Sequence, residues 1–139
     1  MIQALREEVT QYGELLALLE KQQQLILGRS TDGLLGNLRS IHAQVPLVGS
    51  ARQCRDDCRQ ALASALGQPA TISFRILIAA APPHCRALFE ALVDEINDLL
   101  QRSQERLRQN HRLISRSLSS LHRMILELLP SPEQETLCR

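Results

Sequence analysis

The sequence predicts an all-α protein: an elongated antiparallel helical bundle of coiled-coil-like character, with long first, second and last helices and a short connecting helix. The stretch from Pro83 to Leu129 has no internal proline or glycine and repeats leucine and isoleucine at helical spacing. The 139 residues include two Phe, one Tyr and no Trp, so the core must be built from leucine, isoleucine and alanine, which favours helix packed on helix. This length suggests one domain over 1–139.

Charge and hydropathy exclude several classes of protein. The formal net charge is +1, with acidic and basic residues interspersed, so nothing indicates a nucleic-acid or anionic-membrane partner. No apolar run approaches the ~20 residues that span a bilayer. Residues 1–8 are acidic and amphipathic and lack the apolar segment of a signal peptide. We expect a cytoplasmic protein without membrane insertion, whose four cysteines are free thiols.

The first helix is predicted from Gln3 to Leu27. Its apolar positions are spaced mostly by four and three residues, which is typical of a helix in a bundle. These positions are Leu5, Val9, Tyr12, Leu16, Leu19 and Ile26, and the stripe is widened by Leu15, Leu18 and Leu25. Gly28 ends this helix, and residues 29–33 predict a short reversal in which Ser, Thr or Asp caps the next helix.

A second helix is predicted from Gly33 to Leu66. Its inward candidates are Leu34, Leu35, Leu38, Ile41, Val45, Val48, Cys54, Cys58, Ala61, Leu62 and Ala65. Pro46 removes one backbone hydrogen bond and costs about 3 kcal/mol in a helix interior, so we expect a kink or break between His42 and Gly49. A glycine and a proline shortly after Leu66 predict the end of this helix.

The stretch 70–81 is ambiguous. Its large apolar residues alternate as in a half-buried strand: Ile72, Phe74, Ile76 and Ile78. No other stretch has the pattern of a strand, and a lone strand would leave its backbone groups unpaired. We therefore predict a short helix over 72–80, capped by Thr71. The alternative is a strand that pairs with its own copy across a dimer.

The last and longest helix is predicted from Pro83 to Leu129. Unbroken, it would reach roughly 70 Å at 1.5 Å per residue, so other helices or a partner must lie along it. Its seam alternates mostly steps of four and three residues: Ile96, Leu100, Ser103, Leu107, Asn110, Ile114, Leu118, Leu121, Ile125 and Leu128. Asn110 either fixes the register inside this seam or lies at its boundary with water. Residues 130–139 are polar and interrupted by proline, and we expect them to form a loose tail.

No catalytic or metal site can be assembled from the residue pattern. There is no G-x-S-x-G, no H-E-x-x-H and no glycine-rich phosphate loop. Cys54 and Cys58 lie one turn apart, but a structural zinc takes four ligands, and two thiols facing the core explain this pair better. His111 and His122 are better explained as solvated or interface side chains than as ligands. We expect neither an enzyme nor a metal or cofactor.

The C-terminal third of the long helix carries more apolar surface than one packed seam needs. Leu126 and Leu129 spread it around the helix, and the first helix is too short to cover every turn. Exposed apolar surface often marks a partner site. The candidate partner-binding residues are Leu107, Asn110, Leu113, Ile114, Leu118, Leu121, Met124, Ile125 and Leu128. Packing of this surface into a homodimer is the alternative.

Four features carry a family resemblance that covers nearly the whole chain. The leucine-rich first helix ends at Gly28 and is followed by the turn TDGLL at 31–35, and the segment TISFRILIAAAPP at 71–83 leads into the last helix. The segment LRQNHRLI at 107–114 contains an asparagine followed by paired large aliphatic residues, and an apolar seam continues to the end of that helix. Together these features resemble the FlgN family of flagellar export chaperones, although Leu107 stands where that family tends to have a further asparagine.

The resemblance implies a cytoplasmic chaperone for hook–filament junction proteins. It would bind their helical C-terminal segments before export through the flagellar type III apparatus, whose export-gate or ATPase components are further candidate partners. In physical terms, an apolar helix face receives an amphipathic client helix anchored at i, i+3, i+4 and i+7. Two alternatives stay open: a self-associating structural coiled coil or adaptor, and a chaperone of a virulence-type secretion system.

Overall fold

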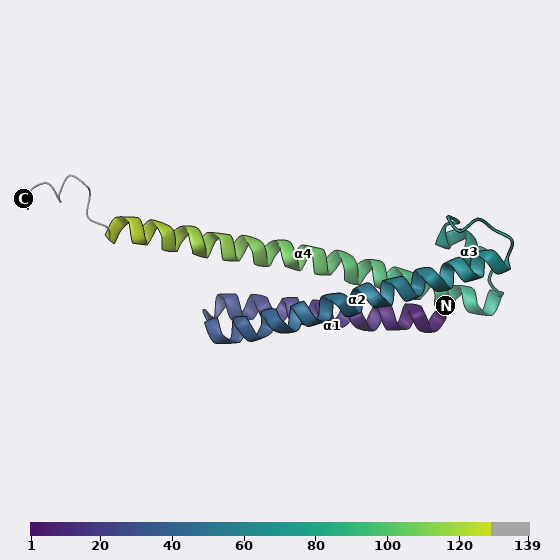
Figure 1. Ribbon diagram of the computed structural model, residues 1–139, viewed down its shortest axis with the longest axis horizontal. Coiled ribbons are helices and arrows are strands. Elements are labelled where there is room, and N and C mark those ends of the chain that lie inside the picture. The colour runs from purple at the N-terminus through teal and green to yellow at the C-terminus, as the bar shows by residue number, and fades with distance from the viewer. Residues whose placement is uncertain (129–139) are drawn as a thin grey trace, which may run out of the picture.

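The protein, in a computed structural model that describes residues 1–128, consists of four helices (Figure 1). They are α1 (Ile2–Leu27), α2 (Thr31–Ala65), α3 (Phe74–Ala80) and α4 (Pro83–Leu128). The predicted all-α class is confirmed, and the three long helices begin and end close to the predicted residues. Leu129, the predicted last residue of the long helix, and the loose tail expected over 130–139 lie outside the described residues.

α1 is the central helix of the molecule. It packs against α2 and against α4, whereas α2 and α4 do not pack on each other anywhere in residues 1–128. The chain reverses after α1 and again before α4, so α4 runs parallel to α1 and antiparallel to α2 (Figure 1). We call the end that holds the N-terminus, α3 and the start of α4 the closed end, and the end at the α1–α2 turn the open end.

The α1–α2 turn has the short form that the sequence predicts. Gly28 is the C-cap of α1, Arg29 has a left-handed φ of 53°, and the Ser30 amide donates to the Leu25 carbonyl at 3.1 Å. Ser30 is the N-cap of α2, although its side chain makes no capping hydrogen bond. A Cβ at Gly33 would lie 2.7 Å from Cδ2 of Leu25, so a larger residue here would require the Leu25 side chain to move.

The face that α2 buries against α1 is partly polar, which the sequence analysis did not predict. Asn37 Nδ2 donates to the Leu18 carbonyl at 3.0 Å, and Gln44 Nε2 donates to the Gln11 carbonyl at 3.1 Å. Val48, one turn further on, is buried on the same face. Each side-chain amide ties one turn of α2 to one carbonyl of α1, so the two hydrogen bonds fix the register of the hairpin.

Several residues of α2 that were predicted to face inward are exposed instead. The prediction is wrong for Leu35, Leu38, Val45, Cys54, Ala61 and Ala65. The reason is that α1 is the one long helix packed against α2 in the described chain, so a single narrow face of α2 is covered. Of the kink or break predicted between His42 and Gly49, the break is wrong, because α2 is helical throughout, and the kink stays a prediction. Pro46 is exposed, so water can satisfy the carbonyl that it frees.

The main apolar core lies towards the closed end, where α2 and α4 both cover α1. Its buried members are Leu5, Tyr12, Leu16, Val48, Ile96 and Leu99. Glu8 is also fully buried and accepts hydrogen bonds of 2.8 and 3.0 Å from Nη1 of Arg55 on α2. Burial raises the pKa of Glu8, and the Arg55 guanidinium opposes that rise. The core and this ion pair together hold the three long helices at one end.

α3 resolves the ambiguous stretch before the long helix. The predicted short helix is confirmed, although it begins at Phe74 and its N-cap is Ser73 instead of Thr71. Leu77 of α3 is buried in a small apolar cluster with Ala63 at the end of α2. The strand alternative is wrong for this segment, because its backbone forms helical hydrogen bonds. α3 therefore closes one end of the bundle and delivers the chain to the start of α4 at Pro83.

Candidate partner-binding surface

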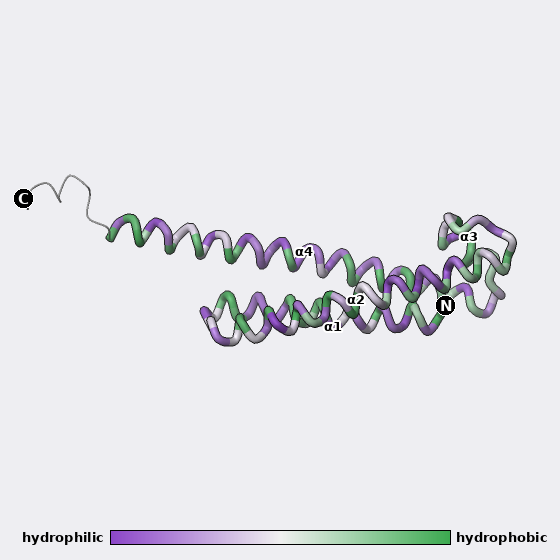
Figure 2. Tube along the Cα trace, viewed as in Figure 1, coloured by the Kyte–Doolittle hydropathy of each residue, from purple (hydrophilic) through white to green (hydrophobic). Residues whose placement is uncertain are grey.

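α4 changes character along its length. Its buried residues all lie between Ile96 and Asn110, whereas every described residue after Ile114 is exposed. Figure 2 shows the polar middle of this helix and the return of hydrophobic residues at its C-terminal end. The α1–α2 turn stops short of that end (Figure 1), so no helix of residues 1–128 covers the last turns of α4. The apolar excess that the sequence predicted is therefore uncovered.

The candidate partner-binding residues differ in how far the fold buries them. Six are exposed: Leu107, Leu118, Leu121, Met124, Ile125 and Leu128. Leu113 and Ile114 are half-buried, and Asn110 is 1% exposed. A chain of steps of four and three residues places five of them on one side of the helix. We call these five the α4 stripe: Ile114, Leu118, Leu121, Ile125 and Leu128.

Asn110 belongs to the seam between α1 and α4. Its Nδ2 donates to the Leu19 carbonyl and to Oε1 of Gln22, both at 2.8 Å. The seam position, one of the two alternatives for Asn110, is therefore the observed one. Beside it, Nη1 of Arg106 donates to Oε1 of Gln23 on α1. This polar zone ties the middle of α4 to α1, so Asn110 holds the helix in register and is not accessible to a partner.

A surface pocket opens where α4 passes the α1–α2 turn. Its volume is about 310 Å³, and all three long helices contribute to it. The apolar lining is Leu25, Ile26, Leu34, Ile114, Leu118 and Leu121. Arg29, in the turn, is the one ionisable side chain among the described residues of this lining. Half of the apolar lining comes from residues of α1 and α2 that were predicted to face the core. The sequence pattern therefore gave no signal of this pocket.

The other residues singled out in the sequence are not gathered into a site. Cys54 is exposed and Cys58 is half-buried, so the prediction that both thiols face the core is wrong for Cys54. His111 and His122 are exposed, as expected of solvated side chains. Over residues 1–128 there is no group of three His, Cys, Asp or Glu that could hold a metal ion. Within the same range, no helix has the length and hydropathy to cross a membrane.

The fold and this surface define an elongated all-α protein whose longest helix carries an uncovered apolar stripe beyond its bundle. The family of the FlgN protein matches residues 1–137, nearly the whole chain, and the chain belongs to this family. FlgN proteins are flagellar export chaperones that bind export substrates. No curated protein and no solved structure matches the sequence.

Proposed function

We propose that this protein is a cytoplasmic chaperone of hook–filament junction proteins and binds their helical C-terminal segments before export through the flagellar type III apparatus. Membership of the FlgN family supports the chaperone role. The observation that carries the binding mode is the α4 stripe, which is exposed from Leu118 to Leu128, along the last turns of α4 that no other helix of the described chain covers. An amphipathic client helix with apolar residues at i, i+3, i+4 and i+7 is complementary to such a stripe.

Burial of this stripe supplies the affinity. Fully burying a leucine or isoleucine side chain contributes about 1.5–3 kcal/mol. Leu118 and Leu121 are 61% and 53% exposed, so roughly half of the surface of each residue is available for a client helix to cover. The client must also order its backbone on binding, which costs about 2–5 kcal/mol. The net affinity therefore depends on a few leucine contacts, and the loss of two of them has a large effect.

The same physics explains why such a client needs a chaperone. A segment with a strong apolar face exposes that face when it is unfolded, and exposed apolar segments aggregate. Binding to the α4 stripe covers the face without requiring the client to reach its final assembled structure. Because the contact is a reversible burial of apolar surface, the client can be released for export without any covalent step.

The test is the double variant Leu121→Ser/Ile125→Ser. We expect it to weaken binding of a junction-protein C-terminal segment about 100-fold, because loss of two apolar contacts costs about 3 kcal/mol. Isothermal titration of the purified segment measures the affinity, and circular dichroism checks that helicity is unchanged. The control Leu126→Ser removes a leucine that is also exposed but lies off the α4 stripe, and it should bind as the unmodified protein does. Unchanged binding of the double variant would contradict the proposal.

The alternative function, a structural coiled coil that only self-associates, uses the same exposed stripe. It predicts a tight dimer at low concentration that unfolds when it dissociates. A chaperone should instead exist as a folded species with its apolar stripe unfilled. Sedimentation at several dilutions, with unfolding followed at each, distinguishes the two functions.

A further inference from the structure

α2 carries a second exposed apolar stripe that faces the same side of the molecule as the α4 stripe. Leu34 of α2 lines the pocket at the α1–α2 turn together with Leu118 of α4. The residues four, seven and eleven positions after Leu34 are also large and apolar, and this spacing keeps them on one face of a helix. Of these, Leu38 is 45% exposed and Val45 is 54% exposed. We call this set the α2 stripe: Leu34, Leu38, Ile41 and Val45.

The pocket at the α1–α2 turn lies between Leu34, the first residue of the α2 stripe, and the first three residues of the α4 stripe, and α1 also contributes to it. We call the continuation of this space between α2 and α4 along α1 the groove. α2 and α4 each pack on α1 but, in the described part of the chain, not on each other. Ile26 of α1 lines the pocket between them, and Leu19, one heptad earlier on the same face, is buried beneath them. Leu107, one heptad before Ile114, extends the α4 wall and is exposed. Three helices thus surround a position that a fourth apolar helix can fill.

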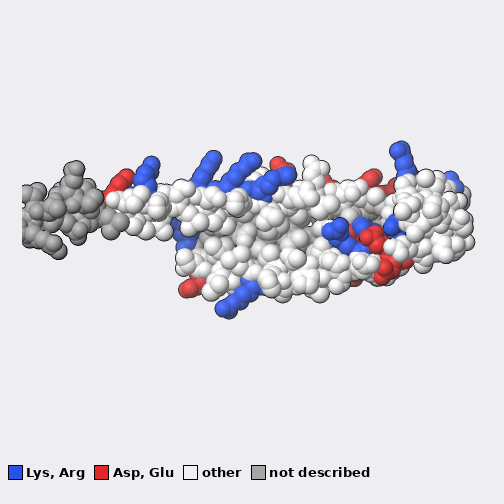
Figure 3. Space-filling model, turned by 45° about the horizontal axis from the view of Figure 1, so that its top comes forward, with Lys and Arg blue, Asp and Glu red and all other residues white. Residues whose placement is uncertain are grey.

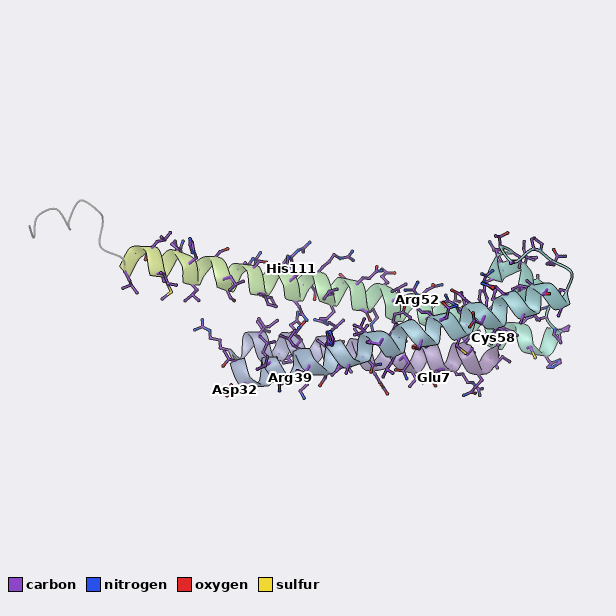
Figure 4. All side chains as sticks on the ribbon, in the orientation of Figure 1. Glu7, Asp32, Arg39, Arg52, Cys58 and His111 are labelled. Carbon is purple, nitrogen blue, oxygen red and sulfur yellow. The ribbon has the colours of Figure 1, made fainter. Side chains whose placement is uncertain are left out.

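Basic side chains border this groove. Arg29 lines the pocket at its open end. Arg52, labelled in Figure 4, follows Val45 by one heptad on α2 and continues the α2 stripe towards the closed end. His111 follows Leu107 by one turn on α4. Figure 3 shows a broad face without charged residues between the basic edge of α4 and the α1–α2 hairpin.

Acidic side chains of α2 and α4 along the same length point elsewhere. On α1, Glu8 lies near Arg52, but it is fully buried and paired with Arg55. Residues 29–52 contain one acidic residue, Asp32, which lies on the edge of the hairpin away from α4 (Figure 4). Residues 104–122 of α4 also contain one, Glu105, which lines a separate pocket together with Glu20 and Arg102. The groove therefore has apolar walls and basic ends, and it is complementary in charge to a helix with acidic flanks.

We propose that the export client docks as an amphipathic helix in the groove between α2 and α4, with its apolar face on both stripes and acidic residues beside Arg29 and Arg52. This inference rests on the proposed function and adds to it a second wall and a charge preference. The α2 wall from Leu34 to Val45 is about 17 Å long at 1.5 Å per residue, which matches about three turns of a client helix. The α4 stripe continues past the α1–α2 turn and holds the rest of the client.

The experiment compares three full-length variants for binding of the junction-protein C-terminal segment. Leu38→Ser/Val45→Ser removes the α2 wall, Leu121→Ser/Ile125→Ser removes the end of the α4 stripe, and Leu47→Ser is the control. Leu47 is also exposed on α2, but it lies two residues after Val45 and so on a different side of the helix. We expect the α2 double variant to bind at least tenfold more weakly, and the control to bind as the unmodified protein does.

The outcomes separate the two proposals. If the α4 variant loses binding and the α2 variant keeps it, the groove is overturned while the proposed function stands. If neither variant loses binding, the proposed function fails and the groove fails with it. If the α2 variant instead abolishes a concentration-dependent dimer seen by sedimentation, the occupant of the groove is a second copy of this chain. Matching urea midpoints for the variants show that the substituted proteins remain folded.

The charge preference has its own test, which does not depend on the identity of the client. Two synthetic amphipathic peptides share the same leucine face and carry either glutamate or lysine on its flanks. We expect the glutamate peptide to bind at least tenfold more tightly than the lysine peptide, and Arg29→Glu to reduce or reverse that preference. Equal binding of the two peptides at low ionic strength overturns the charge assignment.

Discussion

The closed and open ends of this molecule are built from the same three long helices and are rich in the same aliphatic residues. At the closed end, Ile96 and Leu99 of α4 are buried against α1, in one core with Val48 of α2. At the open end, Leu121 and Leu128 belong to the same helix and have the same chemistry, yet they are exposed. The comparison shows that leucine content does not decide burial here; the number of neighbouring helices at each turn does.

This difference separates stability from binding along one helix. The closed end has a core and the Glu8–Arg55 ion pair, so it holds the fold. The open end contributes little apolar burial to folding, so its residues are available to a partner. The polar seam around Asn110 lies between the two, and it fixes α4 on α1 where the apolar packing stops. Substitutions in each of these three regions test the division.

The largest effect is expected for a matched pair of leucines on α4. Leu99→Ala should lower the free energy of unfolding by about 3 kcal/mol, because it leaves a cavity in the core. Leu121→Ala should change it by less than about 0.5 kcal/mol, because Leu121 is already half exposed and alanine is a good helix former. Urea unfolding followed by circular dichroism measures both. Equal losses of unfolding free energy for the two variants would show that Leu121 is buried in solution.

An intermediate effect is expected from Arg55→Ala, because it leaves the carboxylate of Glu8 buried without its main partner. Breaking such a pair costs about 3 kcal/mol when both groups are fully buried, and less here because Arg55 is partly exposed. The exposed pair Arg102–Asp98 provides the control, and Arg102→Ala should cost less than about 0.5 kcal/mol.

The Arg55→Ala variant should also depend on pH in a defined direction. The folded pKa of Glu8 is raised above its unfolded value near 4.5, so the folded state binds this proton more tightly. The stability contributed by protonated Glu8 is fully present below that value and is lost as the pH rises through the folded pKa. Loss of Arg55 raises the folded pKa further. Unfolding midpoints should therefore show more destabilisation at pH 7 than at pH 4, and a loss that is equal at both values would contradict the role of Glu8.

The smallest effect is expected at the seam. Asn110→Ala removes the donor to the Leu19 carbonyl and to Gln22, which should cost about 1–2 kcal/mol. His111→Ala, at the exposed neighbouring position, should leave stability within about 0.5 kcal/mol. The two variants are compared by the same urea titration. If Asn110→Ala were as stable as the unmodified protein, the seam would not be what fixes α4 on α1.

The α4 stripe was predictable and the groove was not, for one physical reason. The stripe follows from spacing within one helix, which the sequence states directly. The groove depends on which helices are neighbours. Leu38 and Val45 have the spacing of core residues, but they stay exposed because α2 has a single long neighbour. In the same way, Asn37 and Gln44 were not among the inward candidates of the second helix, yet they donate to carbonyls of α1.

Helical periodicity, proline and glycine act over a few residues, so the sequence alone was enough to predict the three long helices, a short helix before the last one, and the apolar excess on α4. The tertiary structure decided which apolar faces are covered, placed Arg55 against Glu8, and left α2 and α4 apart over α1. These outcomes join residues that are far apart in the chain, and burial is set by how many neighbouring elements are available to share it. Local spacing carries no information about that number.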